Sequence, residues 1–293
     1  KRLGRASNNQ QDANDGAAKP WTPSSNSGNP PRKSQEQGIT AAGHRINALL
    51  LGEPSADKPT LIFLHGGLDC IGMWRQFPQQ LCAASGLAGI VYDRWGHGKS
   101  DPLILPRPGD PREDEAGQPI SDIIQHFALN KVILVGHSFG GAVALIAGSK
   151  HPGNICGIIS IVPQLIMHAD AMEGLQLAEE AFYKGRLREK LLPFHGDKTD
   201  TLFKNWASMA LKKTVPEKPY AISLEEITCP VLGIFGERDN YGYEPNLALM
   251  TERISSTLEV FKMEEAAHYP HLEKSEPLIA KVCEFISSQA LAL

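Results

Sequence analysis

The sequence predicts an α/β fold in which a mostly parallel central sheet is flanked by helices. Short apolar runs alternate with helix-like segments along most of the chain, and the runs are rich in β-branched residues without polar alternation. Such continuous apolar runs are typical of strands that are buried on both faces of a parallel sheet. The alternation itself favours parallel strands, because each crossover connection then carries a helix.

The predicted elements follow one another in a regular order. Strands are expected at residues 60–65, 88–93, 131–137, 156–162, 230–236 and 258–263. Helices are expected at residues 73–85, 121–128, 140–151, 244–254 and 276–291. Residues 39–52 precede the first of these strands and predict an antiparallel hairpin at the sheet edge.

Two segments depart from this order. Residues 164–225 have a helical pattern rich in Met and aromatic side chains, with no clear strand. We interpret them as a helical cap, or lid, inserted between the two parts of an α/β core, residues 39–163 and residues 226–293. Residues 1–38 are rich in Asn, Gln, Ser, Pro and Gly, and we expect a disordered polar tail because little apolar surface is available for burial.

The composition narrows the classes of partner. The 293 residues carry a net charge of −4, which argues against a nucleic-acid-binding protein. No apolar run approaches the length of a membrane span, so no membrane partner is expected. The five cysteines are scattered and form no CxxC pair, which predicts neither a zinc site nor a disulfide framework and favours a cytoplasmic protein. The oligomeric state is left open, and a monomer is compatible with the sequence.

The strongest chemical motif is Gly136-His137-Ser138-Phe139-Gly140, which fits the pattern G-x-S-x-G. It follows an apolar run and opens a helical one, which is the context that a nucleophile elbow requires. Glycines permit a strained strand-to-helix turn, and that turn raises the serine hydroxyl above the sheet. The motif therefore predicts Ser138 as a nucleophile.

A serine nucleophile needs a base and an orienting acid, which follow it in this order: serine, acid, histidine. Asp239 and His268 each lie in a loop after a predicted strand, so both can converge on Ser138. Glu237 is the rival acid, but Asp239 lies further into its loop. His271 is the rival base, and we expect it instead to cap a helix or to lie at the surface.

Two further motifs surround this predicted triad. The segment HGGLD begins at His65, and a loop in this place supplies one amide of an oxyanion hole while the residue after the nucleophile supplies the other. The expected donors are the backbone N–H groups of Gly67 and Phe139, whereas His65 itself is expected to be structural. In the segment YDRWGHGKS, Asp93 and His97 resemble a second catalytic pair, but we interpret them as residues that stabilise the loop.

Taken in order, the motifs LHGG, YDRWGHGKSD, GHSFGG, GERD and AAHYPHLE resemble the α/β-hydrolase superfamily of serine hydrolases over about residues 39–290. The segments MWRQFPQQL, FHGDKTDTLFKNW and GERDNYG resemble one of its branches, which often has HEGLG and GHSDGG where this chain has HGGLD and GHSFGG. These departures concern the substrate pocket. The chain also resembles the serine-dependent macrolide esterases of antibiotic resistance, which open a macrolactone ring.

The motifs and the resemblance together imply a serine hydrolase that cleaves a small-molecule carboxylic ester or lactone through an acyl-enzyme, without a metal or another cofactor. The narrower expectation is a macrolide lactone. An apolar cap suits a bulky substrate, and the side chains expected to contact it are Leu68, Met167, Met172, Phe182 and Trp206. For each of these side chains the alternative role is packing inside the cap.

Three alternatives stay open. A general carboxylesterase uses the same machinery under a different cap. A C–C bond hydrolase of ring-cleavage diketones shares the fold. A non-catalytic hydrolase-fold binding protein belongs to another class, and the complete set of Ser138, Asp239 and His268 argues against it.

Overall fold

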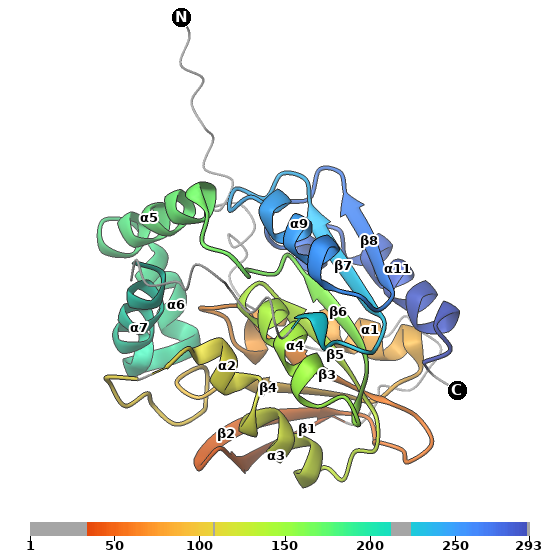
Figure 1. Ribbon diagram of the computed structural model, residues 1–293. Coiled ribbons are helices and arrows are strands. Elements are labelled where there is room, and N and C mark those ends of the chain that lie inside the picture. Colours follow the sequence, from red (N-terminus) through yellow and green to blue (C-terminus); the bar gives the residue numbers. More distant parts are fainter. Residues whose placement is uncertain (1–33, 108, 212–223, 292–293) are drawn as a thin grey trace, which may run out of the picture. The chain divides into compact units, whose positions relative to one another are not determined.

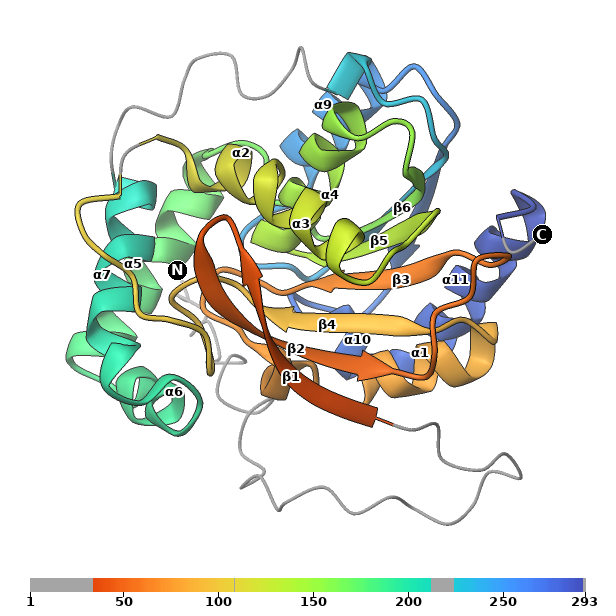
Figure 2. The same ribbon diagram turned by 90° about the horizontal axis from the view of Figure 1, so that it is seen from below.

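A single eight-stranded sheet runs through the protein in the order β1-β2-β4-β3-β5-β6-β7-β8 (Figures 1 and 2). The computed structural model describes residues 34–107, 109–211 and 224–291. All pairs from β4 to β8 are parallel, and only β1 and β2 run antiparallel to their neighbours, so the predicted fold class is confirmed. The strands are β1 Ser34–Ala41, β2 His44–Leu51, β3 Thr60–Leu64, β4 Gly89–Asp93, β5 Val132–His137, β6 Ile155–Ile161, β7 Val231–Gly236 and β8 Leu258–Met263.

The edge hairpin, β1 and β2, begins earlier than its sequence predicts. Residues 34–38 were expected to belong to the polar tail, but they form the first half of β1 and pair with β2. Their polar side chains are mostly exposed, and β1 is the outermost strand of the sheet. Residues 1–33 of the predicted tail lie outside the described residues.

Two apolar cores, one on each face of the sheet, explain the unbroken apolar runs of the central strands. In β5, Val132 and Leu134 enter the core beneath one layer of helices, while Ile133 and Val135 enter the core beneath the other. Every residue of β3, β4 and β5 is buried. A strand with helices on both faces has no exposed side, so it shows no polar alternation.

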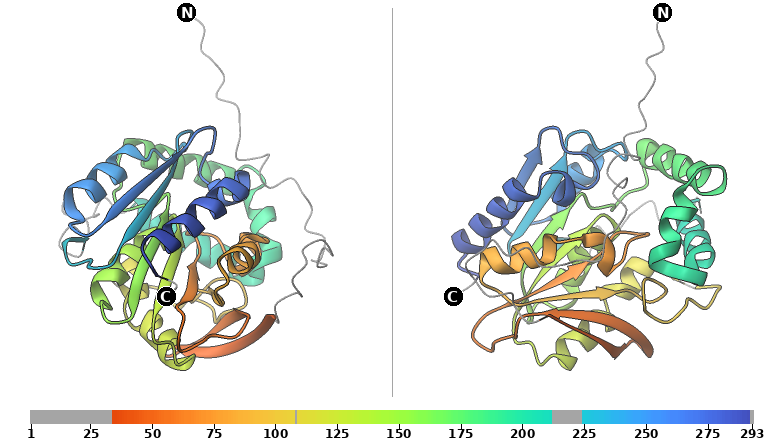
Figure 3. Two further views of the ribbon diagram at one scale, coloured as in Figure 1. Left: turned by 90° about the vertical axis from the view of Figure 1, so that its right-hand side faces the viewer. Right: turned by 180° about the vertical axis from the view of Figure 1, so that it is seen from behind.

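The helices cover both faces of the sheet (Figures 2 and 3). The core on one face includes α3 Gln118–His126, α4 Phe139–Lys150 and α9 Glu244–Arg253, and the core on the other includes α1 Phe77–Ser85 and α11 Ser275–Ser288. Shorter helices, which the sequence pattern does not separate from loops, are η2 Ile71–Trp74, α2 Pro111–Glu115 and α10 Pro270–Glu273.

The predicted helical insertion lies between β6 and β7. It contains α5 Ala169–Tyr183, α6 Leu187–His195, η3 Gly196–Lys198 and α7 Thr199–Leu211 (Figures 1 and 3). These helices have a small core of their own, in which Phe182 and Phe203 stack with ring centroids 3.7 Å apart beside Leu191. Residues 212–223 of the predicted cap lie outside the described residues.

Candidate active site

Ser138 occupies the turn between β5 and α4. Its φ of 54° is unusual for a residue with a side chain, and its N–H donates to the Ile161 carbonyl at 2.9 Å. The flanking glycines permit this turn by close approach: a Cβ at Gly136 would clash with the Gly140 carbonyl, and a Cβ at Gly140 would clash with the Leu64 carbonyl. The strained turn thus places the serine at the N-terminus of α4, as a nucleophile elbow requires.

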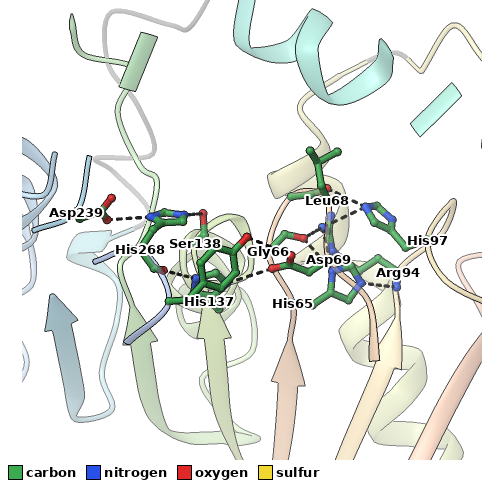
Figure 4. Close-up of polar contacts among 12 residues, drawn as sticks. His65, Gly66, Leu68, Asp69, Arg94, His97, His137, Ser138, Asp239 and His268 are labelled. Atoms are coloured by element: carbon green, nitrogen blue, oxygen red, sulfur yellow. Dashed lines mark hydrogen bonds and ion pairs between the residues drawn. The ribbon is translucent and has the colours of Figure 1, made fainter. Parts of the chain in front are cut away.

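The structure brings the predicted acid and base to this serine (Figure 4). His268 follows β8, and its Nε2 lies 3.1 Å from the Ser138 Oγ. Its Nδ1 lies 2.9 Å from Oδ2 of Asp239, which follows β7. The other carboxylate oxygen of Asp239 accepts from the Tyr241 N–H at 2.9 Å, so the acid is held from both sides. The rival acid Glu237 is exposed, whereas Asp239 is buried.

The charge of Asp239 sets the proton affinity of the histidine. Burial alone would lower the pKa of His268, but the nearby Asp239 carboxylate and its hydrogen bond outweigh burial and raise that pKa above its ordinary value. A neutral His268 donates from Nδ1 to the carboxylate and presents the lone pair of Nε2 to the serine hydroxyl. The arrangement can therefore accept the serine proton and stabilise the resulting imidazolium.

The predicted oxyanion-hole donors lie on two neighbouring elements. Gly67 belongs to the loop that follows β3, residues 65–69, which we call the oxyanion loop. Phe139 is the first residue of α4, where a backbone N–H has no partner within the helix. Gly67 follows β3, which pairs with β5 next to it in the sheet, with Leu64 opposite Gly136, and Phe139 directly follows Ser138 in the chain.

The oxyanion loop is held by side chains that contact its backbone carbonyls. Three buried side chains reach successive oxygens: Arg94 Nη2 lies 2.6 Å from the Gly66 oxygen, His97 Nε2 lies 3.0 Å from the Gly67 oxygen, and His195 Nε2 lies 2.8 Å from the Leu68 oxygen. His195 belongs to α6, and its Nδ1 accepts from the Gly98 N–H at 3.0 Å. A residue of the inserted helices thus helps to hold the oxyanion loop.

A lysine ties the inserted helices to the same part of the core. Lys198 Nζ donates to the Gly98 carbonyl at 2.6 Å, to the Ser100 carbonyl at 2.5 Å and to the His97 carbonyl at 3.3 Å. Burial lowers the pKa of Lys198, and the carboxylates of Asp93 and Asp101 act in the opposite direction. The loop after β4 and the η3 turn are therefore joined by a charged group.

The residues predicted to be structural behave as expected. The Asp93 carboxylate accepts hydrogen bonds from the backbone N–H groups of Ile71 at 2.7 Å and Lys99 at 2.9 Å, so it fixes two loops. Nε2 of His65 accepts from the Arg94 N–H at 3.0 Å. Burial, followed by the charge of Arg94, holds the pKa of His65 well below its ordinary value and keeps the ring neutral.

His271 does not have the role that the sequence suggested. It was expected to cap a helix or to lie at the surface, but it is 3% exposed. Its ring lies 4.5 Å from the ring of His137 and 4.8 Å from that of Trp74, measured between centroids. Burial holds the pKa of His271 well below its ordinary value. His271 lies in the short helix α10 Pro270–Glu273, and its ring packs in the interior against Trp74 and His137.

Sequence reasoning missed a second acid–histidine pair behind the first. Nδ1 of His137 lies 3.3 Å from Oδ2 of Asp69, and its Nε2 lies 2.7 Å from the backbone oxygen of His268 (Figure 4). The Tyr269 hydroxyl donates to Asp69 Oδ1 at 3.4 Å. Burial would raise the pKa of Asp69, but the hydrogen bond and charge of His137 lower it. The signals were an acid directly after HGGL and a histidine inside the elbow.

The predicted substrate side chains divide into different environments. Trp206 of α7 lies against Gly67, because a Cβ at Gly67 would clash with the indole Nε1 and Cδ1. Leu68 and Trp206 are half-buried and pack against the cap core. Phe182 is 3% exposed and stacks face to face on Phe203, so packing rather than substrate contact accounts for it. Met167 and Met172, also predicted here, are half-buried near the start of α5.

Within residues 34–107, 109–211 and 224–291, no group of three or more His, Cys, Asp or Glu side chains could hold a metal ion. In the same part of the chain, no helix has both the length and the apolar character needed to cross a membrane.

The sequence is similar to known proteins over part of its length. The model of the alpha/beta hydrolase fold family matches residues 59–203. The chain is 26% identical to human monoglyceride lipase over 129 residues, which are 41% of this chain and 40% of that protein. It is 25% identical to epoxide hydrolase B of Mycobacterium tuberculosis over 124 residues, 42% of this chain and 34% of that protein. The chain therefore spans less than half the length of these two relatives.

Solved structures share the fold over most of the chain. A bacterial membrane phospholipase A has a TM-score of 0.71 at 19% identity, covering 88% of this chain and 87% of that chain. A thermophilic esterase from Thermogutta terrifontis has a TM-score of 0.66 at 20% identity, covering 87% and 99%. Naproxen esterase from Bacillus subtilis has a TM-score of 0.65 at 19% identity, covering 87% and 92%.

Proposed function

We propose that this chain, which has the α/β-hydrolase fold, hydrolyses carboxylic esters through an acyl-enzyme formed on Ser138. The observation that carries the proposal is the position of His268, which contacts the Ser138 hydroxyl at 3.1 Å and the Asp239 carboxylate at 2.9 Å. A serine becomes an effective nucleophile when a base removes its proton, and this base is oriented by a buried acid. The esterases and lipases among the similar proteins support the same reaction class.

The reaction has two halves. The Ser138 Oγ attacks the ester carbonyl while His268 takes its proton, and the N–H groups of Gly67 and Phe139 stabilise the negative oxygen of the tetrahedral intermediate. His268 then gives the proton to the leaving alcohol, and the acyl-enzyme remains. A water molecule deprotonated by the same histidine attacks the acyl carbon, and the proton returns to Ser138 as the acid leaves.

The inserted helices are proposed to act as a lid that restricts access to Ser138. Support comes from the contact of the Trp206 indole with Gly67, and from His195, which bonds to the Leu68 carbonyl. A bulky indole against an oxyanion donor limits the size and orientation of the acyl or alcohol group that reaches the site. Leu68 and Trp206 are the strongest candidates for substrate contact, since Phe182 is occupied by packing.

A macrolide lactone is the narrower substrate hypothesis, and the sequence resemblance supports it. A general carboxylesterase is equally compatible with the site. Incubation with a macrolide antibiotic followed by mass spectrometry distinguishes them, because lactone opening adds the mass of one water molecule. An unchanged macrolide together with hydrolysis of simple esters would leave the general carboxylesterase.

The proposed activity is tested with a short-chain p-nitrophenyl ester. We expect serine-dependent release of p-nitrophenol, a loss of at least about 10³-fold in kcat for Ser138→Ala, and labelling of Ser138 by a fluorophosphonate. Ser149→Ala is the matched control, because Ser149 lies near the far end of α4 and its hydroxyl donates to the Ile146 carbonyl of the same helix. Wild-type protein that neither hydrolyses esters nor takes up the label would support the binding-protein alternative. Cleavage of a ring-cleavage diketone without ester cleavage would support the C–C hydrolase.

A further inference from the structure

Arg94 is a buried cation that has no role in the reaction steps proposed above. It follows β4, is 2% exposed, and has no carboxylate within ion-pair distance among the residues that the structure describes. Its Nη2 donates to the Gly66 carbonyl at 2.6 Å, and its guanidinium lies 4.1 Å from the centroid of the Phe139 ring. Burial lowers the pKa of Arg94 to about 10, although the charge of the Glu115 carboxylate, which lies beyond ion-pair distance, acts in the opposite direction. The guanidinium is therefore held in the interior at an electrostatic cost.

The bonded carbonyl belongs to the peptide unit that supplies an oxyanion-hole donor. The Gly66 C=O and the Gly67 N–H are the two ends of one planar trans peptide, so they point in opposite directions. A donor fixed on the oxygen therefore fixes the direction of the N–H. Withdrawal of electron density by a cation also makes that N–H a stronger donor, as in other polarised chains of hydrogen bonds.

A second side chain acts on the same oxygen. His65 Nε2 accepts from the Arg94 N–H, which places the proton of the neutral ring on Nδ1, and Nδ1 donates to the Gly66 oxygen at 2.9 Å. The Asp69 N–H lies 3.3 Å from this oxygen as well. The Gly66 oxygen thus accepts hydrogen bonds from three donors, on Arg94, His65 and Asp69.

We propose that Arg94 is a positioning residue for the oxyanion hole: its bond to the Gly66 carbonyl orients and polarises the Gly67 N–H. The proposal rests on the proposed ester hydrolysis. The guanidinium would stabilise the transition state, in which the carbonyl oxygen of the substrate is negatively charged, and would have little effect on binding of the neutral ester.

The test compares Arg94→Met and Arg94→Lys with Arg107→Met. Arg107 is the control because its side chain is only 8% exposed and pairs with Glu115 and Asp114, while none of its contacts among the described residues is with Gly66. Steady-state kinetics use the best p-nitrophenyl ester, and binding uses a trifluoromethyl ketone with the same acyl chain. Addition of the Ser138 Oγ to this ketone moves the serine proton to His268 and leaves a negative oxygen in the oxyanion hole.

We expect Arg94→Met to lower kcat at least about tenfold, with KM within about threefold of wild type. The affinity for the trifluoromethyl ketone should fall by a factor similar to the loss in kcat. Arg94→Lys should recover part of both losses, and it provides the comparison if the Met variant does not fold. An equal kcat loss in Arg107→Met, or a kcat loss with unchanged ketone affinity, would overturn the positioning role. A wild-type protein without Ser138-dependent hydrolysis would instead overturn the proposed function, and this inference with it.

Discussion

The contact between Gly67 and the Trp206 indole predicts a measurable coupling between the oxyanion loop and the inserted helices. The change is Gly67→Ala, which adds only a Cβ. Gly67 does not have a positive φ, so alanine brings no backbone strain. The new Cβ would clash with Nε1 and Cδ1 of Trp206, and the indole would have to move by roughly 1 Å to restore carbon contacts of about 3.5 Å.

The magnitude follows from the cost of overpacking a well-packed contact, about 1–3 kcal/mol. If the reaction requires the Trp206 indole to stay against residue 67, kcat/KM falls roughly 5- to 150-fold. In the double variant Gly67→Ala/Trp206→Ala the Cβ has space, so the effect of Gly67→Ala should become small. A double-mutant cycle on ester hydrolysis then gives a coupling of about 1–3 kcal/mol.

Gly153→Ala is the control, because a Cβ at Gly153 would meet no atom within 4 Å in the part of the chain that the structure describes, and its φ is not positive. Its kcat/KM should equal that of wild type. Additive effects of Gly67→Ala and Trp206→Ala would refute the reasoning, since they would mean that the indole does not meet the added methyl group. Circular dichroism and thermal unfolding of each variant exclude a global loss of structure.

Three other predictions concern the acid, the cap core and the cap attachment. His268 must be neutral to act as a base, and its pKa is raised, so kcat/KM should fall as the pH drops through a midpoint above 6.5. In a pH–rate profile, Asp239→Asn should move this midpoint downward and lower kcat by about 10³–10⁴-fold. Phe182→Ala should destabilise the cap core by about 3–5 kcal/mol, seen as faster amide exchange in α5 and α7 with unchanged exchange in the central strands. Lys198→Met should leave carbonyls of the loop after β4 without their charged donor, and amide exchange there and in η3 should rise while the sheet stays protected.

The central strands, and the proximity of Ser138, Asp239 and His268, could be predicted from sequence because local features indicate both. A strand buried on both faces is a continuous apolar run, and the runs at residues 131–137 and 230–236 became β5 and β7 with small changes at their ends. Ser138 is identified by its flanking glycines, which the close approach of backbone at the elbow requires. The acid and base follow from chain order and from their places in loops after strands.

The remaining features depend on tertiary contacts that no local pattern records. The first half of β1 is polar because it lies at the sheet edge, so its composition resembles that of a tail. Asp69 and His137 are 68 positions apart, and only the neighbouring positions of β3 and β5 bring their loops together. His271 was misplaced because burial by α10 depends on packing against Trp74 and His137.

The inserted helices leave and rejoin the sheet at two adjacent strands, so another segment could replace them without a change in the sheet. The chain departs after β6 and returns to β7, and these are adjacent parallel strands with Ile158 paired to Val231 and Ile161 paired to Ile234. The hydrogen bonds between β6 and β7 do not depend on the sequence of the segment that connects these two strands. Ser138, Asp239 and His268 all lie outside the insertion, so a transplanted segment from a related protein is expected to alter substrate choice while the proposed catalytic side chains are retained. Such a graft would need to keep a donor to the Leu68 carbonyl and a cation at the loop after β4.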